Sequence, residues 1–446
     1  TKKQIIEVYR KMALSRKLDD KMLILLKQGK SFFHIGASGH EAAQLAAAEV
    51  IKPGEDWSFP YYRDGAYCIG LGMTAREQLL SFLAKAADPN SGGRQMPQHY
   101  GHKDLRIVSQ SSPTGTQFLQ AVGCALVCKM GKTKEVVYVS AGEGTTSQGD
   151  FHEALNWASN AKAPVIFHIQ DNEYAISTHR SEQTASSIYD MTSGYGNLSR
   201  YDVDGTDFFE TSLAFKEAVQ RARRDKGPSI IVSHVVRLLP HSSSDDQRKY
   251  RDEKALNNDL KKDPLLILES KCIDAKFIKA DEFAKIRLQV DKDVDIDSAW
   301  AEEQDFPEPE TAMDHIYSSK EYPEESTFNP VAEKIVIVDA INHALHEEME
   351  LNEKMVVYGQ DIADPKGGVF TATKGLSDKF GNGRVFNSPL AESSIVGTAV
   401  GMAVSGYKPV VEIQFGDYIW TAMMQIRNEV ATMRYRSNNS WACPMV

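Results

Sequence analysis

The chain alternates between helical and strand-like apolar patterns. Residues 4–29 place apolar side chains near the helical period, which predicts one long helix. Short β-branched runs at 135–140 and 164–170 predict two buried strands, and residues 150–161 between them predict a helix. This strand–loop–helix–strand order is typical of a parallel sheet flanked by helices.

The same pattern continues through the chain and begins again near residue 331. Before that point it predicts further elements: helices at 118–130, 216–224, 263–272, 280–290 and 297–305, and a strand at 229–236. After it, the pattern predicts helices at 339–349 and 393–405 and strands at 355–358 and 410–414. We therefore expect an α/β protein with parallel sheets flanked by helices, in two related domains.

A charged stretch separates these two series of elements. Residues 248–325 contain no candidate chemistry and are typical of solvated helices, and proline-rich segments at 307–310 and 322–326 indicate the end of one unit. We expect a first domain at 1–320, a linker at 321–330 and a second domain at 331–446.

Composition narrows the class of protein. The 446 residues are 42% hydrophobic and 25% charged, as in ordinary globular domains. The net charge of −10, without a strongly basic block, argues against nucleic-acid binding. The five cysteines lack metal-site spacing, which fits a cytoplasmic location, and we expect Cys124 and Cys128 to be buried. No apolar run has membrane-spanning length, and the start at Thr1 shows no signal-peptide pattern.

Candidate chemistry lies where the strands at 135–140 and 164–170 end. Gly142 and Gly144 leave room for a bulky anion in front of a helix, although such a turn is common in any α/β protein. Glu143 and Asn172 carry hard oxygen ligands suited to Mg²⁺. Because ligands bind at the carboxyl ends of parallel strands, the pattern predicts a metal–diphosphate site.

Several motifs resemble one known family. The segments 142–144 and 171–177 (Gly-Glu-Gly and Asp-Asn-Glu-Tyr-Ala-Ile-Ser) resemble the thiamine diphosphate motif of 2-oxoacid dehydrogenase E1 components, nearest to the branched-chain type. Four further segments strengthen the resemblance: 62–64 (Tyr-Arg-Asp), 93–101 (Gly-Arg-Gln-Met-Pro-Gln-His-Tyr-Gly), 111–113 (Ser-Ser-Pro) and 241–246 (His-Ser-Ser-Ser-Asp-Asp). From about residue 331 the chain resembles the start of the β subunit, which implies that α and β subunits are fused.

The resemblance implies a ligand set for thiamine diphosphate and its metal. It implies magnesium ligation by Glu143, Asn172 and Tyr174. It implies cofactor contacts from Tyr62, Arg63, Ser112, Thr114, Gly142, Gly144, Thr145 and Gln170 in the α-like part, and from Leu390, Gln414 and Tyr418 in the β-like part. From spacing alone, Arg63 fits a surface ion pair with Asp64 as well as a phosphate. Gln170 stands where the family commonly has arginine.

Three further roles follow from the resemblance. The loop at 111–117 could simply cap the next helix, but in this family it implies potassium ligation by Ser111, Pro113, Thr116 and Gln117. The polar segment 239–246 has the composition of a solvated turn; the resemblance makes it an active-site loop with His241 near the reacting carbon. Glu392 fits an N-terminal helix cap, whereas the resemblance implies a hydrogen bond to the cofactor's aminopyrimidine.

The function implied by the resemblance is oxidative decarboxylation of a branched-chain 2-oxoacid, such as 2-oxoisovalerate, with acyl transfer to the lipoyl group of an E2 acyltransferase. The alternatives are a pyruvate- or acetoin-type E1 component, or a cofactor-binding subunit without turnover of its own. The resemblance also implies a homodimer equivalent to α2β2. It places the β subunit's catalytic histidine and C-terminal domain beyond Val446, so that the β-like part looks cut short.

Overall fold

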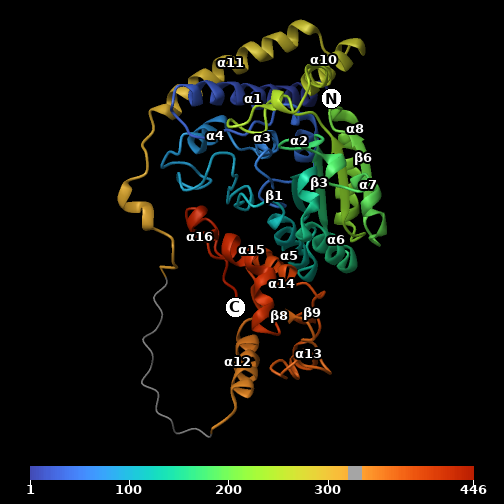
Figure 1. The fold of residues 1–446 in the computed structure, drawn as a ribbon, viewed down its shortest axis with the longest axis vertical. Helices are drawn as coiled ribbons and strands as arrows, with labels where there is room; N and C mark the ends of the chain where they lie inside the picture. Colours follow the sequence, from blue (N-terminus) through green and yellow to red (C-terminus); the bar gives the residue numbers. More distant parts are fainter. Residues whose placement is uncertain (320–333) are drawn as a thin grey trace.

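The computed structural model describes residues 1–319 and 334–446 (Figure 1). We call these two parts the first and the second unit. The predicted linker at 321–330 lies outside the described residues.

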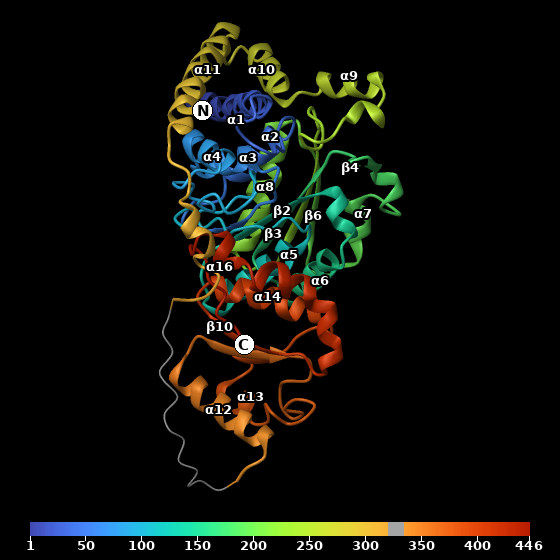
Figure 2. The same cartoon turned by 60° about the vertical axis from the view of Figure 1, so that its left-hand side comes forward.

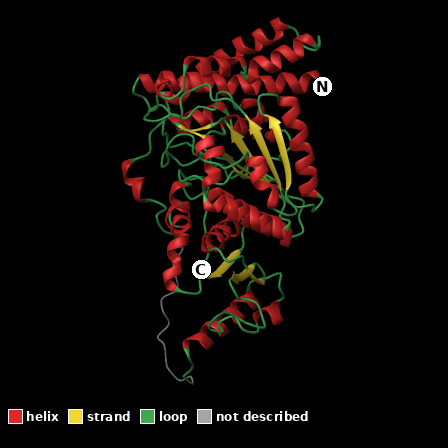
Figure 3. Ribbon diagram, turned by 45° about the vertical axis from the view of Figure 1, so that its right-hand side comes forward, coloured by secondary structure: helices red, strands yellow, loops and turns green. Residues whose placement is uncertain are grey.

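The first unit is built on a five-stranded parallel sheet of order β1-β2-β3-β7-β6 (Figure 3). The strands are β1 (Trp57–Phe59), β2 (Val137–Gly142), β3 (Val165–Asp171), β6 (Ser199–Asp204) and β7 (Ser229–His234). In the register of the sheet, Gly142 lies beside Gln170, and Asp171 lies beside His234. The carboxyl ends of β2, β3 and β7 therefore meet at one edge, where a short hairpin of β4 (Tyr174–Ala175) and β5 (Thr178–His179) follows.

Helices cover both faces of this sheet because side chains alternate across each strand. Tyr138 and Ile166 pack into the core beneath α1, α2 and α8, whereas Val139 and Phe167 pack against α5 and α6. The helices of this unit are α1 (Lys2–Lys27), α2 (Glu41–Ala48), α3 (Gly65–Leu71), α4 (Ala75–Phe82), α5 (Thr116–Met130), α6 (Gly149–Ala161), α7 (Ile188–Met191), α8 (Phe208–Arg223), α9 (Glu253–Lys261), α10 (Pro264–Asp274) and α11 (Ala280–Glu302).

The second unit has a smaller parallel sheet of order β10-β8-β9. Its strands are β8 (Met355–Gly359), β9 (Val385–Asn387) and β10 (Lys408–Glu412). Its helices are α12 (Ile337–Leu351), α13 (Leu376–Phe380), α14 (Glu392–Val404), α15 (Met423–Gln425) and α16 (Met433–Arg436). The expected α/β class with parallel sheets is thus confirmed in both units.

The two units pack through helices α5 and α14, which lie between the sheets (Figure 2). Small residues let the helix backbones approach closely. A Cβ atom added at Gly123 would lie 1.9 Å from the Thr398 carbonyl oxygen, and one added at Gly401 would lie 1.8 Å from that of Gln120. Tyr358 and Ile395 share a core with Phe118 and Val139, so one hydrophobic cluster spans both units.

Two differences from the predicted elements have local causes. The helices expected at 280–290 and 297–305 are one continuous helix, α11, whose apolar positions Phe283, Ile286, Val290 and Val294 bury one face along α1. The strand β6 was not predicted, because its sequence Ser-Arg-Tyr-Asp-Val-Asp is polar and the strand lies at the sheet edge.

Two expectations from composition can be compared with the structure. All five cysteines are free, and both Cys124 and Cys128 are buried as expected. Among the described residues, no helix is both long and apolar enough to cross a membrane.

Candidate active site

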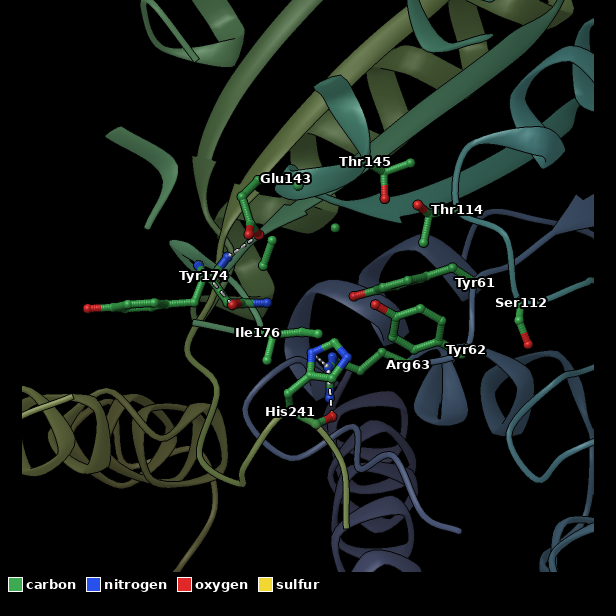
Figure 4. A pocket seen from close by; sticks show the side chains of 14 residues that line it. Tyr61, Tyr62, Arg63, Ser112, Thr114, Glu143, Thr145, Tyr174, Ile176 and His241 are labelled. Atoms are coloured by element: carbon green, nitrogen blue, oxygen red, sulfur yellow. Dashed lines mark hydrogen bonds between the residues drawn. The ribbon is translucent and has the colours of Figure 1, made fainter. Parts of the chain in front are cut away.

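A cavity of about 340 Å³ opens at the carboxyl ends of β2 and β3 (Figure 4). It brings together eleven of the residues singled out in the sequence: Tyr62, Arg63, Ser112, Thr114, Gly142, Glu143, Gly144, Thr145, Asn172, Tyr174 and His241. Its lining also includes Tyr61, Ala175 and Ile176, which the sequence analysis missed. Tyr61 directly precedes a recognised motif, and Ile176 lies inside one. Their position next to motif residues could therefore have indicated that they line the cavity.

The carboxylate predicted as a metal ligand lies on a single turn of 3-10 helix, residues Glu143–Ser147, directly after β2. Its Oε2 accepts a hydrogen bond from the backbone amide of Asn172 at 3.2 Å. The Asn172 side-chain oxygen in turn accepts from the Tyr174 amide at 3.3 Å. The loops after two neighbouring strands therefore hold all three predicted magnesium ligands around one end of the cavity.

Close packing shapes this end of the cavity. A Cβ atom added at Gly144 would lie 2.5 Å from the Ala175 Cβ atom, so a side chain there would collide with the turn that follows β3. Glycine is thus required at this position by the approach of two loops.

The Glu143 carboxyl group is poorly stabilised as an anion in the cofactor-free protein. Burial, and secondly the nearby Asp171 carboxylate, raise the pKa of Glu143 to about 7. A cation placed between the Glu143 and Asn172 oxygens would remove this penalty, because an opposite charge favours the ionised carboxylate. The donor set fits a hard divalent ion.

Arg63 and His241 meet at the opposite wall of the cavity (Figure 4). Arg63 donates to the Gly36 carbonyl at 2.7 Å and to the His241 carbonyl at 3.2 Å, and its Nη2 lies 3.5 Å from His241 Nδ1. Burial and the positive charges of Arg63 and Arg237 lower the pKa of His241 to about 4. The imidazole is therefore neutral at pH 7. Because Arg63 can only donate, Nδ1 accepts and the ring proton lies on Nε2.

Arg237 is a second buried cation beside the cavity, and the sequence analysis assigned it no role. It donates to the Ile176 carbonyl at 3.1 Å and to the Tyr250 hydroxyl at 2.7 Å, while its buried Nε has no partner among the described residues. Burial and the neighbouring Arg63 lower its pKa. Within the described residues, neither Arg63 in the cavity wall nor Arg237 beside it forms an ion pair with a carboxylate, so the cavity favours a bound anion.

Gln170 lies behind the cavity and is not part of its lining. Its Nε2 donates to the Asp64 carboxylate at 2.6 Å, and its Oε1 accepts from Gln44 at 2.9 Å. The alternative ion pair of Arg63 with Asp64 is not formed. Instead Asp64 is fully buried and hydrogen bonded to Ser140 and Gln170, and burial raises its pKa to about 7.

The loop predicted to bind potassium is closed by hydrogen bonds within the protein. The Pro113 carbonyl accepts from the Thr116 hydroxyl at 3.2 Å, and Gln117 Oε1 accepts from the Gly115 amide at 3.1 Å. The Ser111 hydroxyl donates to Glu429 of the second unit. The four predicted ligands are thus grouped on one loop.

The predicted residues of the second unit gather elsewhere. Glu392 begins α14 and accepts from Gln360 Nε2 at 3.3 Å and from the Thr421 hydroxyl at 3.2 Å. Gln414 donates to Asp361, Tyr418 is half exposed, and Leu390 is 82% exposed. Among the described residues, the cavity lining comes only from positions 61–241, so Glu392, Leu390, Gln414 and Tyr418 do not line the cavity of their own chain.

Comparisons with known proteins agree with this architecture. The family described as dehydrogenase E1 component matches residues 9–310, and the family described as transketolase, pyrimidine binding domain matches residues 333–445. A 2-oxoisovalerate dehydrogenase subunit alpha of Bacillus subtilis (strain 168) is 42% identical over 320 residues, which are 71% of this chain and 96% of that protein.

More distant relatives share the same segment. The mitochondrial 2-oxoisovalerate dehydrogenase subunit alpha 1 of Arabidopsis thaliana is 35% identical over 252 residues, 56% of this chain and 53% of that protein. A pyruvate dehydrogenase E1 component subunit alpha of Staphylococcus aureus (strain Mu50) is 35% identical over 267 residues, 60% of this chain and 69% of that protein. The chain therefore belongs to the thiamine diphosphate-dependent dehydrogenase E1 component family, and it carries an α-type unit and a pyrimidine-binding unit in one polypeptide.

Proposed function

We propose that this chain catalyses the oxidative decarboxylation of a branched-chain 2-oxoacid, 2-oxoisovalerate or a close relative, and transfers the acyl group to the lipoyl group of an E2 acyltransferase. The observation that carries the proposal is the cavity at the ends of β2 and β3. It has acidic and amide oxygens at one end, Arg63 in the opposite wall and Arg237 beside it, and neither arginine forms an ion pair within the described residues. The substrate class rests on the printed name of the 42% identical relative.

Magnesium would be held by the Glu143 carboxylate, the Asn172 side-chain oxygen and the Tyr174 carbonyl. The raised pKa of Glu143 supports this assignment, because a metal ion would offset the effects of burial and of Asp171 that destabilise the carboxylate. Potassium would be held by the segment 111–117 through Ser111, Pro113, Thr116 and Gln117. The Thr116 hydroxyl and Pro113 carbonyl oxygens already lie 3.2 Å apart. Gly142, Thr145, Tyr62, Ser112 and Thr114 would surround the cofactor, with Gln170 supporting them from behind.

When bound, thiamine diphosphate supplies the carbon nucleophile that attacks the 2-oxoacid, and it holds the electron pair that remains when carbon dioxide leaves. The protein binds and orients the cofactor and the 2-oxoacid. Arg63 offers two donors whose present acceptors, Gly36 and His241, are backbone carbonyls, so it can also attract a diphosphate. The Nε2–H of His241 can donate a proton or a hydrogen bond at the cavity wall during acyl transfer.

Glu392 would hold the proton shared with the aminopyrimidine, and Leu390, Gln414 and Tyr418 would line that half of the site. Because these residues lie outside the cavity of their own chain, the site needs a second copy of the chain to supply them. The second unit also exposes the apolar side chains of Leu390, Phe415 and Trp420, which supports such a contact. We therefore propose a homodimer equivalent to α2β2.

The domain bounds that we propose follow from the similarity to the two families. We propose that residues 1–320 form the diphosphate- and magnesium-binding domain, that 321–330 form the linker, and that 331–446 form the pyrimidine-binding domain. All five cysteines are free, which supports a cytoplasmic location.

A comparison of two substrates tests this proposal. Decarboxylation is measured with thiamine diphosphate, Mg²⁺ and an artificial electron acceptor, with 2-oxoisovalerate and pyruvate supplied separately. We expect a higher kcat/KM for 2-oxoisovalerate. A preference for pyruvate would favour a second candidate, a pyruvate-type E1 component, which the 35% identity to a pyruvate dehydrogenase subunit supports.

A further inference from the structure

The motif at residues 93–101 contains a histidine that contacts a residue of the cavity lining. His99 is buried, with 4% of its surface exposed, and its Nε2 lies 2.7 Å from the Ser112 hydroxyl oxygen. Ser112 belongs to the cavity lining and lies at its rim, beside Tyr62 (Figure 4). A buried imidazole therefore stands directly behind a hydroxyl group that a ligand can reach.

The partners of His99 determine which atom donates. Its Nδ1 lies 3.1 Å from the Pro97 carbonyl oxygen, and a carbonyl can only accept, so the Nδ1 atom bears the proton. Burial lowers the pKa of His99, and the nearby Arg436 guanidinium lowers it further, so the ring is neutral at pH 7. A neutral imidazole with its proton on Nδ1 has a lone pair on Nε2. Ser112 must donate its only proton to that lone pair.

The loop that carries Ser112 is held from the second unit. Arg436 donates to the Ser109 carbonyl at 3.0 Å and to the Glu429 carboxylate at 2.7 Å. Glu429 also accepts from Ser111, next to Ser112. Arg436 and Glu429 are both buried, so these bonds are shielded from water. The buried ion pair thus holds the segment just before Ser112, through the Ser109 carbonyl and the Ser111 hydroxyl group, which restricts movement of Ser112.

We propose that His99 is a positioning residue that turns the lone pairs of Ser112 toward the cavity, so that Ser112 accepts a hydrogen bond from an O–H group on the substrate. This inference rests on the proposed function for the nature of the substrate. Ser112 would thus accept a hydrogen bond from a hydroxyl group on carbon 2 of the substrate. It would not bind the carboxylate or the keto oxygen of the 2-oxoacid. Ser112 would therefore stabilise the substrate only after its keto oxygen has gained a proton.

The hydrogen-bond direction can be tested in the cofactor-free protein, independently of activity. Nitrogen NMR of histidine-labelled protein at pH 7.5, with the His99 signals assigned by their loss in His99→Phe, reports which ring nitrogen is protonated. We expect a neutral ring with the proton on Nδ1. A proton on Nε2, or a doubly protonated ring, would make Ser112 a donor to the cavity and overturn the proposal.

The ligand preference is tested with two unreactive acids, 2-hydroxy-3-methylbutanoate and 3-methylbutanoate, which differ only in the hydroxyl group. With thiamine diphosphate and Mg²⁺ present, calorimetry should show that Ser112→Ala weakens binding of the hydroxy acid about 3- to 10-fold, as expected for the loss of one hydrogen bond. Binding of 3-methylbutanoate should change less than about twofold, since it makes no such bond.

The histidine variants separate positioning from general damage. His99→Phe should reproduce the Ser112→Ala effect and add nothing in the Ser112→Ala background, because both remove one interaction. His99→Gln keeps an acceptor near the Nε2 position and should restore part of the affinity. His102→Gln is the matched control, since His102 bonds Glu77 outside the cavity at 3.3 Å. Equal weakening of both acids, or additive effects in the double variant, would contradict the proposal.

The two levels of inference can fail separately. If neither acid binds the wild-type protein, the proposed substrate class is wrong, while the NMR measurement still decides the direction of the Ser112 hydrogen bond. If both acids bind with equal affinity, the substrate class stands and the proposed role of Ser112 is wrong.

Discussion

The backbone amide of Asn172 donates a hydrogen bond to the Glu143 carboxylate at 3.2 Å, which joins the ends of β2 and β3. This bond orients Glu143 before any metal arrives, and it fixes the turn that carries the Asn172 side chain. Burial has raised the pKa of the same carboxyl group to about 7, so an ordered carboxyl group stands where an added positive charge would favour its ionised form. The relationship is that of a preformed cation site.

Glu143→Gln should weaken Mg²⁺-dependent binding of thiamine diphosphate by at least about 10-fold, because it removes the only anionic ligand among the three. Calorimetry at fixed Mg²⁺ measures the loss. The control is Glu173→Gln, an exposed acid next to Asn172 in the turn after β3, which forms an ion pair with Arg180 at 3.4 Å. Equal affinity of the two variants would remove Glu143 from the metal site.

Arg63→Lys should weaken the diphosphate contact about tenfold while the fold is retained. Lysine keeps the charge but cannot reach Gly36 and His241 with a planar pair of donors. The same titration, compared with Arg248→Lys in an exposed ion pair with Asp246, checks this result. Wild-type affinity in Arg63→Lys would show that a point charge is sufficient.

Asp64 should make stability fall as the pH rises. Its folded-state pKa is about 7, against an ordinary value near 3.8, so the folded protein holds a proton that the unfolded chain loses between these values. The stability loss over this window is about 1.4 kcal/mol per unit of pKa difference at most. Asp64→Asn should therefore stabilise the protein more at pH 8 than at pH 5. Urea unfolding at both pH values measures the difference, and an equal effect at both would contradict it.

Two inactive variants should restore activity when they are combined, if a second chain completes each site. Glu392→Gln should abolish turnover with diphosphate binding intact, and Glu143→Gln should abolish it through the metal. Random mixing of the two should give hybrid dimers with one intact site, about a quarter of wild-type activity. Activity assays after unfolding and joint refolding measure this. No recovery from mixtures that contain hybrid dimers would show that Glu392 and Glu143 act within one chain.

The segment from β2 to β3 could be predicted from the sequence because short runs of neighbouring residues specify each of its elements. β-branched runs, two glycines and an amphipathic helix each specify an element, and parallel pairing then brings Glu143 and Asn172 to one edge. The separation of Glu392 from the cavity could not be predicted. It depends on how α14 packs against α5, and this contact joins residues far apart in the chain.

Other features of the site could not be predicted, because the sequence around them looks like that of an ordinary turn, loop or strand. Arg237 follows the buried strand β7, where a polar residue usually marks a turn, and only burial without an ion-pair partner makes it notable. His99 lay inside a recognised motif, but its importance depends on Pro97 and Ser112, which fold around it from two loops. Edge strand β6 has only two apolar residues, Tyr201 and Val203, on its core side, which is too short a pattern to predict a strand.

The most direct measurement is calorimetric titration of thiamine diphosphate into the wild-type chain, once with Mg²⁺ and once with a chelator. We expect saturable binding that requires Mg²⁺ and that weakens as the pH falls below about 7, where Glu143 is protonated. Binding that is absent, or equally strong with the chelator, would contradict a metal-anchored diphosphate at the ends of β2 and β3.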